Sequence, residues 1–424
     1  MLGWLAPDGR LVLLTASLRS FSVGFVSVML GLYLAETGFD AVRIGAVLAA
    51  VLAGSTFFIM LASLFADRMG RKRFFIALTL LTILGGALFP LTEPFLLLLL
   101  VAGFAGFGLG GADRGAHGAL EQPILARSTP DTKRTTLFAY YHVIRGMSAA
   151  LGALFSSMPV FMERALDVEV LDAYRVMFFL YACVGVLIVL VFTRLSTAAE
   201  APAAEGRRSL FSWPRRSKGI IYRLTALGAM DSSGDGLMVQ TFMAYWFSLR
   251  FDLSLESLAG VFFGVNVLSS LSAFIAVWLA KRIGLLNTMV FTHIPANLLS
   301  IGMAFAPFAW LAVGMMLLRG FLSQMDVPTR QSYTMAVVDP AEQTVAAGLS
   351  QLGRQGGQLP SPYIAGQLVA ASLPGAPLII GGTVKVIYDL LLLHQFRNIH
   401  PPEEQTRQGG GAPSDEHDTG NLRQ

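Results

Sequence analysis

Residues 67–73 read Asp-Arg-Met-Gly-Arg-Lys-Arg and separate two long apolar runs of the chain. A shorter version of this stretch, Lys281-Arg282-Ile283-Gly284, follows an apolar run in the second half. Each copy places basic side chains and a glycine where two hydrophobic segments meet. The repetition predicts two related halves, each of which turns at a short basic loop.

The composition indicates a membrane protein. Of 424 residues, 54% are hydrophobic and only 14% are charged, and the mean hydropathy is +0.60. A helix that crosses the bilayer needs about 20 mostly apolar residues. Such runs predict twelve spans, near 10–34, 44–65, 74–92, 95–119, 135–157, 175–194, 221–248, 256–280, 286–306, 308–336, 343–371 and 376–396.

These runs predict an all-α polytopic fold, because a backbone in lipid must satisfy its own hydrogen bonds and the runs are too long for barrel strands. The first span is too long for a cleaved signal sequence, so we expect it to remain as a helix. A single cysteine, Cys183, excludes a disulfide within the chain.

Basic residues cluster after the second, fourth, sixth and eighth spans, which predicts that both termini are cytoplasmic. We expect a multi-pass protein of a bacterial inner (plasma) membrane that does not bind nucleic acid. The predicted organisation is an N-terminal six-helix bundle (1–195), a cytoplasmic linker (196–220), a C-terminal six-helix bundle (221–397) and a disordered cytoplasmic tail (398–424).

Ionisable residues also repeat between the halves. Asp113 and Asp326 occupy corresponding places in the fourth and tenth spans, and Arg145 and Arg354 do so in the fifth and eleventh. Both pairs are about 210 residues apart, an offset typical of duplicated halves packed around a pseudo-axis along the membrane normal. The default expectation is a substrate site between the halves.

Twelve spans, a central cytoplasmic linker and the Asp67-Arg68-x-Gly70-Arg71 motif together resemble the major facilitator superfamily of secondary transporters. Two departures are that Ser63 replaces a usual glycine and that Lys281 replaces the Asp in the second copy. The resemblance implies two six-helix bundles. It also implies a cytoplasmic gate in which Asp67 and its basic neighbours pair with the ends of other spans, with Asp113 and Arg114 as local candidates. The alternative is that the basic residues only set topology.

Charged residues deep in spans are costly and usually face the protein interior. Arg145, Asp231 and Arg354 lie near mid-membrane, and Arg19 lies about 9 residues into its span. Asp235 follows Asp231 by one helical turn. Glycine and serine around these two aspartates predict a broken or kinked seventh span. In the eleventh span the polar residues Gln351, Arg354, Gln355 and Gln358 form one stripe, which predicts contact with water, substrate or charges.

The chemistry of these groups leaves two interpretations open. The arginines keep their charge and suit an anionic substrate, while desolvation favours proton exchange at Asp231 or Asp235. Alternatively, either aspartate forms a permanent ion pair with Arg19 or Arg354. We assign Asp326 and Arg330 to the cytoplasmic gate, and we expect Lys385 and Asp389 to neutralise each other. His293 is expected to be a satisfied packing residue.

The chain has no phosphate loop and no zinc-protease or hydrolase motif, so we expect no enzyme, no cofactor and no resident metal. The prediction is a monomeric secondary transporter that moves a small organic solute by alternating access. Proton-coupled efflux by antiport is favoured because no sugar-uptake signature occurs. Alternatives are proton-coupled uptake or exchange of an organic anion, a metal-ion exporter, and a non-transporting membrane sensor of the same fold.

Overall fold

The computed structural model describes residues 4–109, 117–118, 121, 124–125, 128–129, 134–196, 216–339 and 342–397. Asp113, Arg114, most of the predicted linker and the predicted tail lie outside these residues. The helices are α1 (Pro7–Glu36), α2 (Ala41–Met69), α3 (Arg71–Leu88), η1 (Phe89–Leu91), α4 (Phe95–Phe104), α6 (Arg134–Phe155), α7 (Met158–Leu166), α8 (Val170–Phe192), α9 (Lys218–Leu237), α10 (Gln240–Phe251), α11 (Leu255–Ile283), α12 (Leu285–Ala304), α13 (Ala309–Ser323), α14 (Asp326–Val337), α15 (Gln343–Gln358), α16 (Ser361–Ala370) and α17 (Ala376–Phe396).

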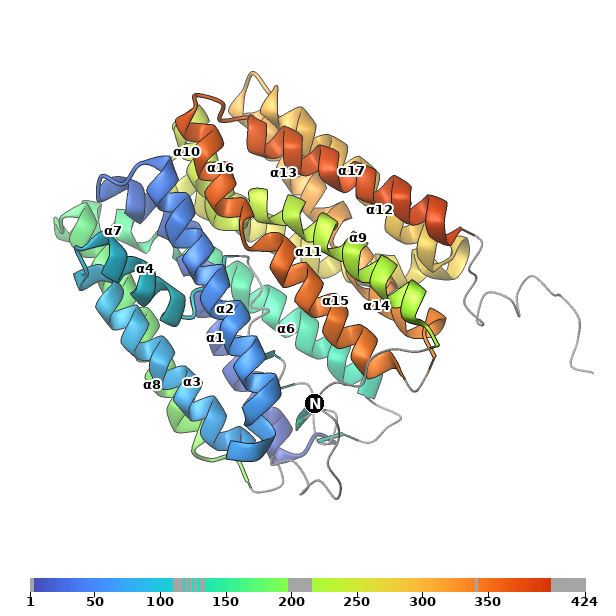
Figure 1. Ribbon diagram of the computed structural model, residues 1–424. Helices are drawn as coiled ribbons and strands as arrows, with labels where there is room; N and C mark the ends of the chain where they lie inside the picture. The colour runs from blue at the N-terminus through green and yellow to red at the C-terminus, as the bar shows by residue number, and fades with distance from the viewer. Residues whose placement is uncertain are drawn as a thin grey trace, which may run out of the picture.

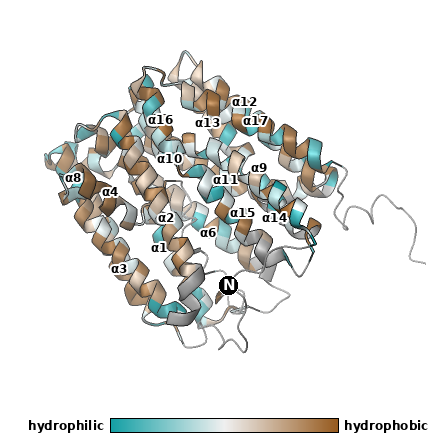
Figure 2. Ribbon diagram, viewed as in Figure 1, coloured by the Kyte–Doolittle hydropathy of each residue, from teal (hydrophilic) through white to brown (hydrophobic). Residues whose placement is uncertain are grey.

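The described residues form helices at each predicted span, which confirms the all-α prediction. Seven of the described helices are long and apolar enough to cross a bilayer, and α4 and α13 are shorter apolar helices. Figure 2 shows α3 coloured mostly as hydrophobic and α9 with hydrophilic residues. The seventh span breaks into α9 and α10 just after Gly236, as predicted, and the eleventh breaks at Pro360 into α15 and α16, because proline cannot continue the hydrogen-bond ladder.

The helices form two groups (Figure 1). In the first half α1 packs against α6 and α8, and α3 packs against α8; in the second half α9 packs against α15 and α17, and α12 packs against α13 and α17. Between the halves, α6 contacts α11 and α2 contacts α16. The halves therefore meet along two seams.

We call the end of the bundle that holds the α1–α2, α10–α11 and α16–α17 connections the distal end. One hydrophobic core there contains residues of both halves, such as Met29, Val47 and Phe242. Toward the opposite end the described apolar side chains separate into one core within the first half and others within the second. The distal end is thus where the halves share buried apolar surface, and burial of that surface stabilises their closure.

Glycines allow the close approach of the halves at this end. A Cβ on Gly366 of α16 would lie 2.3 Å from the carbonyl oxygen of Ala41, and a Cβ on Gly45 of α2 would lie 2.5 Å from the carbonyl oxygen of Pro362. Gly70 and Gly284, the glycines of the repeated basic stretch, have φ of 89° and 88°. That left-handed backbone favours glycine at both turns.

Replacing Gly366 with isoleucine should open the distal end, because overpacking of this kind costs about 1–3 kcal/mol. Spin labels on the α1–α2 and α16–α17 connections, in a Cys183→Ser background, should report a longer distance in Gly366→Ile. The matched control is Gly260→Ile on α11, where an added Cβ meets no atom within 4 Å. Equal distances in both variants would contradict the closure assigned to this contact.

Candidate functional site

The centre of the second half holds a network of charged side chains built on α9. Asp231 and Asp235 lie one turn apart on this helix, and α17 and α15 approach it closely at small residues. A Cβ on Gly234 would lie 2.5 Å from Lys385 of α17, and one on Gly357 of α15 would lie 2.0 Å from the carbonyl oxygen of Ala229. The glycines therefore bring cation-bearing helices within reach of the two aspartates.

Cations from three other helices contact Asp231. Arg354 of α15 donates to its Oδ2 at 2.7 Å, and Arg330 of α14 donates to the same oxygen at 3.2 Å. The ammonium of Lys385 lies 3.2 Å from Oδ1. Asp235 bonds to Lys385 and lies 3.5 Å from Arg354. Arg330 also pairs with Asp326 at 2.6 Å. One continuous network thus joins α9, α14, α15 and α17.

His293 of α12 extends the network. Its Nδ1 lies 2.8 Å from Oδ1 of Asp389, and its Nε2 lies 3.8 Å from Oδ1 of Asp231. The amide of Asn297 donates to Asp389 at 3.2 Å. An imidazole that faces a carboxylate at each ring nitrogen carries a proton on both nitrogens only as the imidazolium.

The network is largely removed from water. Exposed fractions of the side chains are 1% for Asp231, 3% for Lys385 and 3% for His293, against 16% for Arg354. Four carboxylates (Asp231, Asp235, Asp326 and Asp389) face three fixed cations (Arg330, Arg354 and Lys385) in direct contact. Arg319 stands outside these contacts and donates to Ser300 at 2.7 Å. A proton on His293 would therefore equalise the charges of the contact network.

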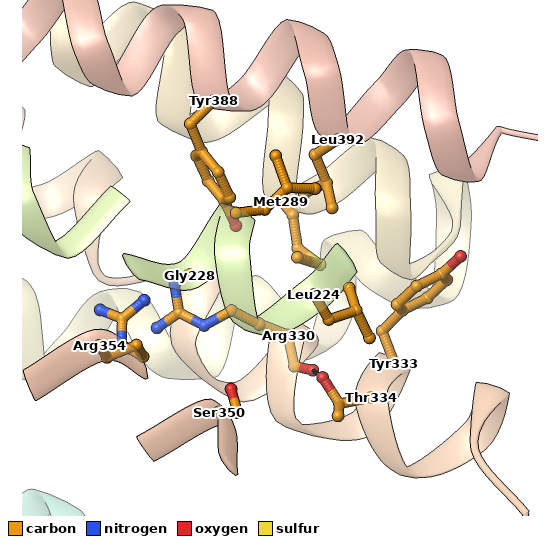
Figure 3. Close-up of a pocket in the computed structure, with 11 residues that line it drawn as sticks. Leu224, Gly228, Met289, Arg330, Tyr333, Thr334, Ser350, Arg354, Tyr388 and Leu392 are labelled. Atoms are coloured by element: carbon orange, nitrogen blue, oxygen red, sulfur yellow. Dashed lines mark hydrogen bonds between the residues drawn. The ribbon is translucent and has the colours of Figure 1, made fainter. Parts of the chain in front are cut away.

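A small pocket opens beside the network, between α9, α12, α14, α15 and α17 (Figure 3). The guanidinium groups of Arg330 and Arg354 lie next to each other at its edge, as expected from their shared acceptor on Asp231. Its other walls include Leu227, Met289 and Tyr388. This pocket lies within the second half rather than at the seam between the halves.

The first half pairs its deep charges differently. Arg19 of α1 makes two hydrogen bonds to Glu121, at 2.6 and 3.0 Å, and the hydroxyl of Tyr141 donates to Glu121 at 2.6 Å. Arg145 of α6 lies over the ring of Tyr141, with its guanidinium carbon 5.0 Å from the ring centre. Nε and one terminal nitrogen of Arg145 are buried and have no hydrogen-bond partner in the part of the chain that the structure describes.

Of the two interpretations of the aspartates, the structure shows the ion-paired arrangement with Arg354. The proposed pairing with Arg19 is wrong, because Arg19 binds Glu121. The prediction that Lys385 and Asp389 neutralise each other is also wrong. Lys385 pairs with Asp235 of α9, and Asp389 pairs with His293 of α12. Each finds a closer opposite partner on a neighbouring helix than on its own.

Arg330 pairs with both Asp326 and Asp231, so these two gate candidates belong to the same network as Asp231. Their assignment to the cytoplasmic gate stays a prediction. Gln355 of α15 contacts Thr56 of α2 in the other half, with 3.4 Å between Thr56 Oγ1 and Gln355 Oε1. Gln351 is exposed and Gln358 is partly buried on the same helix. The polar stripe of the eleventh span therefore contacts the charge network through Arg354 and the opposite half through Gln355.

The remaining gate prediction stays a prediction. Gly70 and Arg71 are described, with Arg71 buried at the start of α3, whereas only the backbone of Asp67 and Arg68 is described, within α2. Their candidate partners Asp113 and Arg114 lie outside the described residues.

The roles of four residues in these networks were not predicted from the sequence: Glu121, His293, Lys385 and Asp389. Each is an ionisable residue inside an apolar run, and that signal could have identified it as part of a charge network. Sequence spacing gave no means to choose partners between helices.

Comparisons with known proteins fit this architecture. The model of the Major Facilitator Superfamily matches residues 12–362. An uncharacterized membrane protein of Saccharomyces cerevisiae is 23% identical over 92% of this chain and 94% of its own length.

Three solved structures share the fold. A mutant of the nucleoside transporter NupG has a TM-score of 0.74 at 15% identity, covering 92% of this chain and 100% of its own. A D-xylose–proton symporter has a TM-score of 0.67 at 13% identity, covering 91% and 96%. The human organic anion transporter MFSD10 has a TM-score of 0.61 at 15% identity, covering 91% and 100%.

Asp231→Asn should destabilise the protein, since removing one partner of a buried ion pair costs about 3–5 kcal/mol. The melting temperature of the purified protein in detergent should fall, and adding Lys385→Met should restore part of the loss by removing a cation left uncompensated. Asp172→Asn is the matched control, because Asp172 pairs with Arg175 at an exposed site. A melting temperature of Asp231→Asn equal to that of the control would contradict the account.

Proposed function

The chain belongs to the major facilitator superfamily, and we propose that it is a proton-coupled secondary transporter that exports a small organic solute by alternating access. The superfamily and the twelve-span fold make the chain a multi-pass membrane transporter. Proton coupling, export and the class of solute are the parts that we propose.

The observation that carries proton coupling is the position of His293 between two carboxylates. Its ring nitrogens face Asp389 on α17 and Asp231 on α9, in a site almost without exposure. Histidine is the side chain whose charge ordinarily changes between about pH 5 and 8. The carboxylates of the contact network outnumber its fixed cations by one, so one proton bound to His293 supplies the missing positive charge.

The same contacts favour the histidine, rather than the aspartates predicted from the sequence, as the site of proton coupling. Asp231 contacts Arg330, Arg354 and Lys385 at once, and an opposite charge at such distances favours the ionised form of a carboxylate. Protonating Asp231 would leave three cations facing a neutral acid. We therefore propose that Asp231 and Asp235 hold the cations in place and that His293 carries the proton.

A change of charge at His293 can reach the seam between the halves. Asp231 and Asp235 lie just before the break between α9 and α10, and α10 packs against α1. Arg354 lies on α15, whose Gln355 contacts Thr56 of α2. Loss of the proton adds a net negative charge to the network, so Lys385 and the arginines must redistribute. Of the helices that bear these cations, α15 contacts α2 of the first half. Coupling requires a part of the protein with two arrangements, whose populations are shifted both by the proton and by the solute.

The direction of transport rests on the sequence. The chain lacks a recognisable sugar-uptake signature, so we propose export, with protons moving in the opposite direction. Among the solved relatives of the same fold, the D-xylose–proton symporter shows by its name that this architecture can couple a proton to an organic solute. The bacterial plasma membrane and a monomeric state remain predictions for this chain.

His293→Gln should abolish transport driven by a pH gradient while retaining exchange of solute without a gradient, because glutamine hydrogen-bonds but does not titrate. The measurement is flux in proteoliposomes, in both orientations, of a solute found by thermal-shift screening. His394→Gln is the control, since His394 is an exposed histidine in the last turn of α17. Flux of His293→Gln that followed the pH gradient as in the unmodified protein would overturn proton coupling at this residue.

A further inference from the structure

We propose that the transported solute is an organic anion with one negative charge, such as a monocarboxylate, and that Arg145 of α6 binds its anionic group. The inference rests on the proposed transport function and adds to it the class of the solute. Three features support it: the orientation of Arg145, the lack of a carboxylate in contact with it among the described residues, and a second unsatisfied donor on α11 of the other half.

Arg145 points toward the interior of the protein. At about 100° per residue, Leu154 falls on the opposite side of α6 from Arg145, and Leu151 falls on the opposite side from His142. Leu154 and Leu151 are 45% and 54% exposed, as expected of side chains that face lipid. The face that bears Arg145 and the exposed His142 is therefore turned away from lipid, between α1 and α11, against both of which α6 packs.

Among the residues that the structure describes, no carboxylate forms an ion pair with Arg145. Glu121, which accepts from the Tyr141 hydroxyl beside Arg145, also accepts from both terminal nitrogens of Arg19. Arg145 lies over the face of the Tyr141 ring, and its Nε and one terminal nitrogen are buried without an acceptor among the described residues. A buried donor of this kind is costly until it is satisfied.

A second unsatisfied donor lies on α11, across the same seam. A Cβ on Gly146, the residue after Arg145, would lie 1.9 Å from Oγ of Ser270, so this level of α6 faces Ser270. Asn266 is one turn from Ser270, accepts its hydroxyl at its backbone oxygen, and has a buried side-chain nitrogen without a partner. The unsatisfied nitrogens of Arg145 and Asn266, one residue on each half, are donors, so the complementary ligand is rich in acceptors.

Arg145 differs from three other deep arginines, which pair with carboxylates. Arg19 is neutralised by Glu121, Arg354 by Asp231, and Arg330 by Asp326 and Asp231. Arg145 thus offers one fixed positive charge that contacts no carboxylate among the described residues. A carboxylate accepts two hydrogen bonds from a guanidinium and compensates a single charge, whereas a dianion would bring a second, uncompensated charge to this depth.

The experiment measures binding of matched acids and amides to the purified full-length protein. Benzoate and hexanoate are the anionic probes, and benzamide and hexanamide are their neutral counterparts, titrated by calorimetry and by thermal shift. We expect the acids to bind and the amides not to bind. Arg145→Gln should weaken binding of the acids by about tenfold to a hundredfold, the range for a hydrogen bond to a charged group, and Arg145→Lys should retain part of it.

Arg43→Gln is the matched control. Arg43 also stacks on aromatic rings, those of Phe39 and Phe95, but it is exposed at the distal end, so its loss should leave binding of the acids unchanged. Failure of both acids to bind, equal binding of the amides, or undiminished binding to Arg145→Gln would each overturn the inference. Should a variant fold poorly, the comparison of acids with amides on the unmodified protein still decides between these outcomes.

The two proposals fail in different ways. Acids that bind through Arg145 but are not driven by a pH gradient would leave the anion site standing and refute proton coupling. Amides that bind as tightly as the acids, together with flux of a neutral solute that follows the gradient and needs His293 but not Arg145, would overturn the anion site and leave proton coupling intact.

Discussion

A carboxylate held almost entirely out of water is the constraint on which the second half of this protein depends. Asp231 is 1% exposed, and the desolvation of such a charge costs several kcal/mol unless opposite charges and hydrogen bonds compensate it. The compensation comes from α14, α15 and α17, so the position of each of these helices is tied to one residue of α9. Glycines at the crossings make the approach possible, which explains why small residues flank the aspartates.

The distribution of polar and apolar contacts fits a protein that changes shape. At the distal end the halves share a hydrophobic core, and further along the bundle the described apolar cores belong to one half or the other. Hydrophobic burial is non-directional and favours closure, whereas the charge network depends on the proton and on the geometry of its members. The distal core can thus hold the halves together at one end while the charge state of the network biases their arrangement.

Hydropathy and the duplicated basic stretch were sufficient to predict the helical fold and its two halves, because bilayer thickness dictates the length of the spans. The break in the seventh span was also predictable from glycine and serine around Asp231. The partners of the charged residues were not predictable: Arg19 was matched with aspartates of the other half, and Glu121 was not predicted to be its partner. An ion pair is decided by which helices lie side by side and how they are rotated, and a linear sequence does not contain that information.

The central claim is that His293 bears a proton between Asp389 and Asp231. Nitrogen NMR of protein labelled with ¹⁵N at its six histidines, assigned by the signals missing from His293→Gln, observes this state directly. The account predicts that without solute, at neutral pH, both ring nitrogens of His293 are protonated, and that both signals change together as the proton leaves at higher pH. A neutral ring with one bare nitrogen at neutral pH, unchanged by further rise in pH, would contradict it.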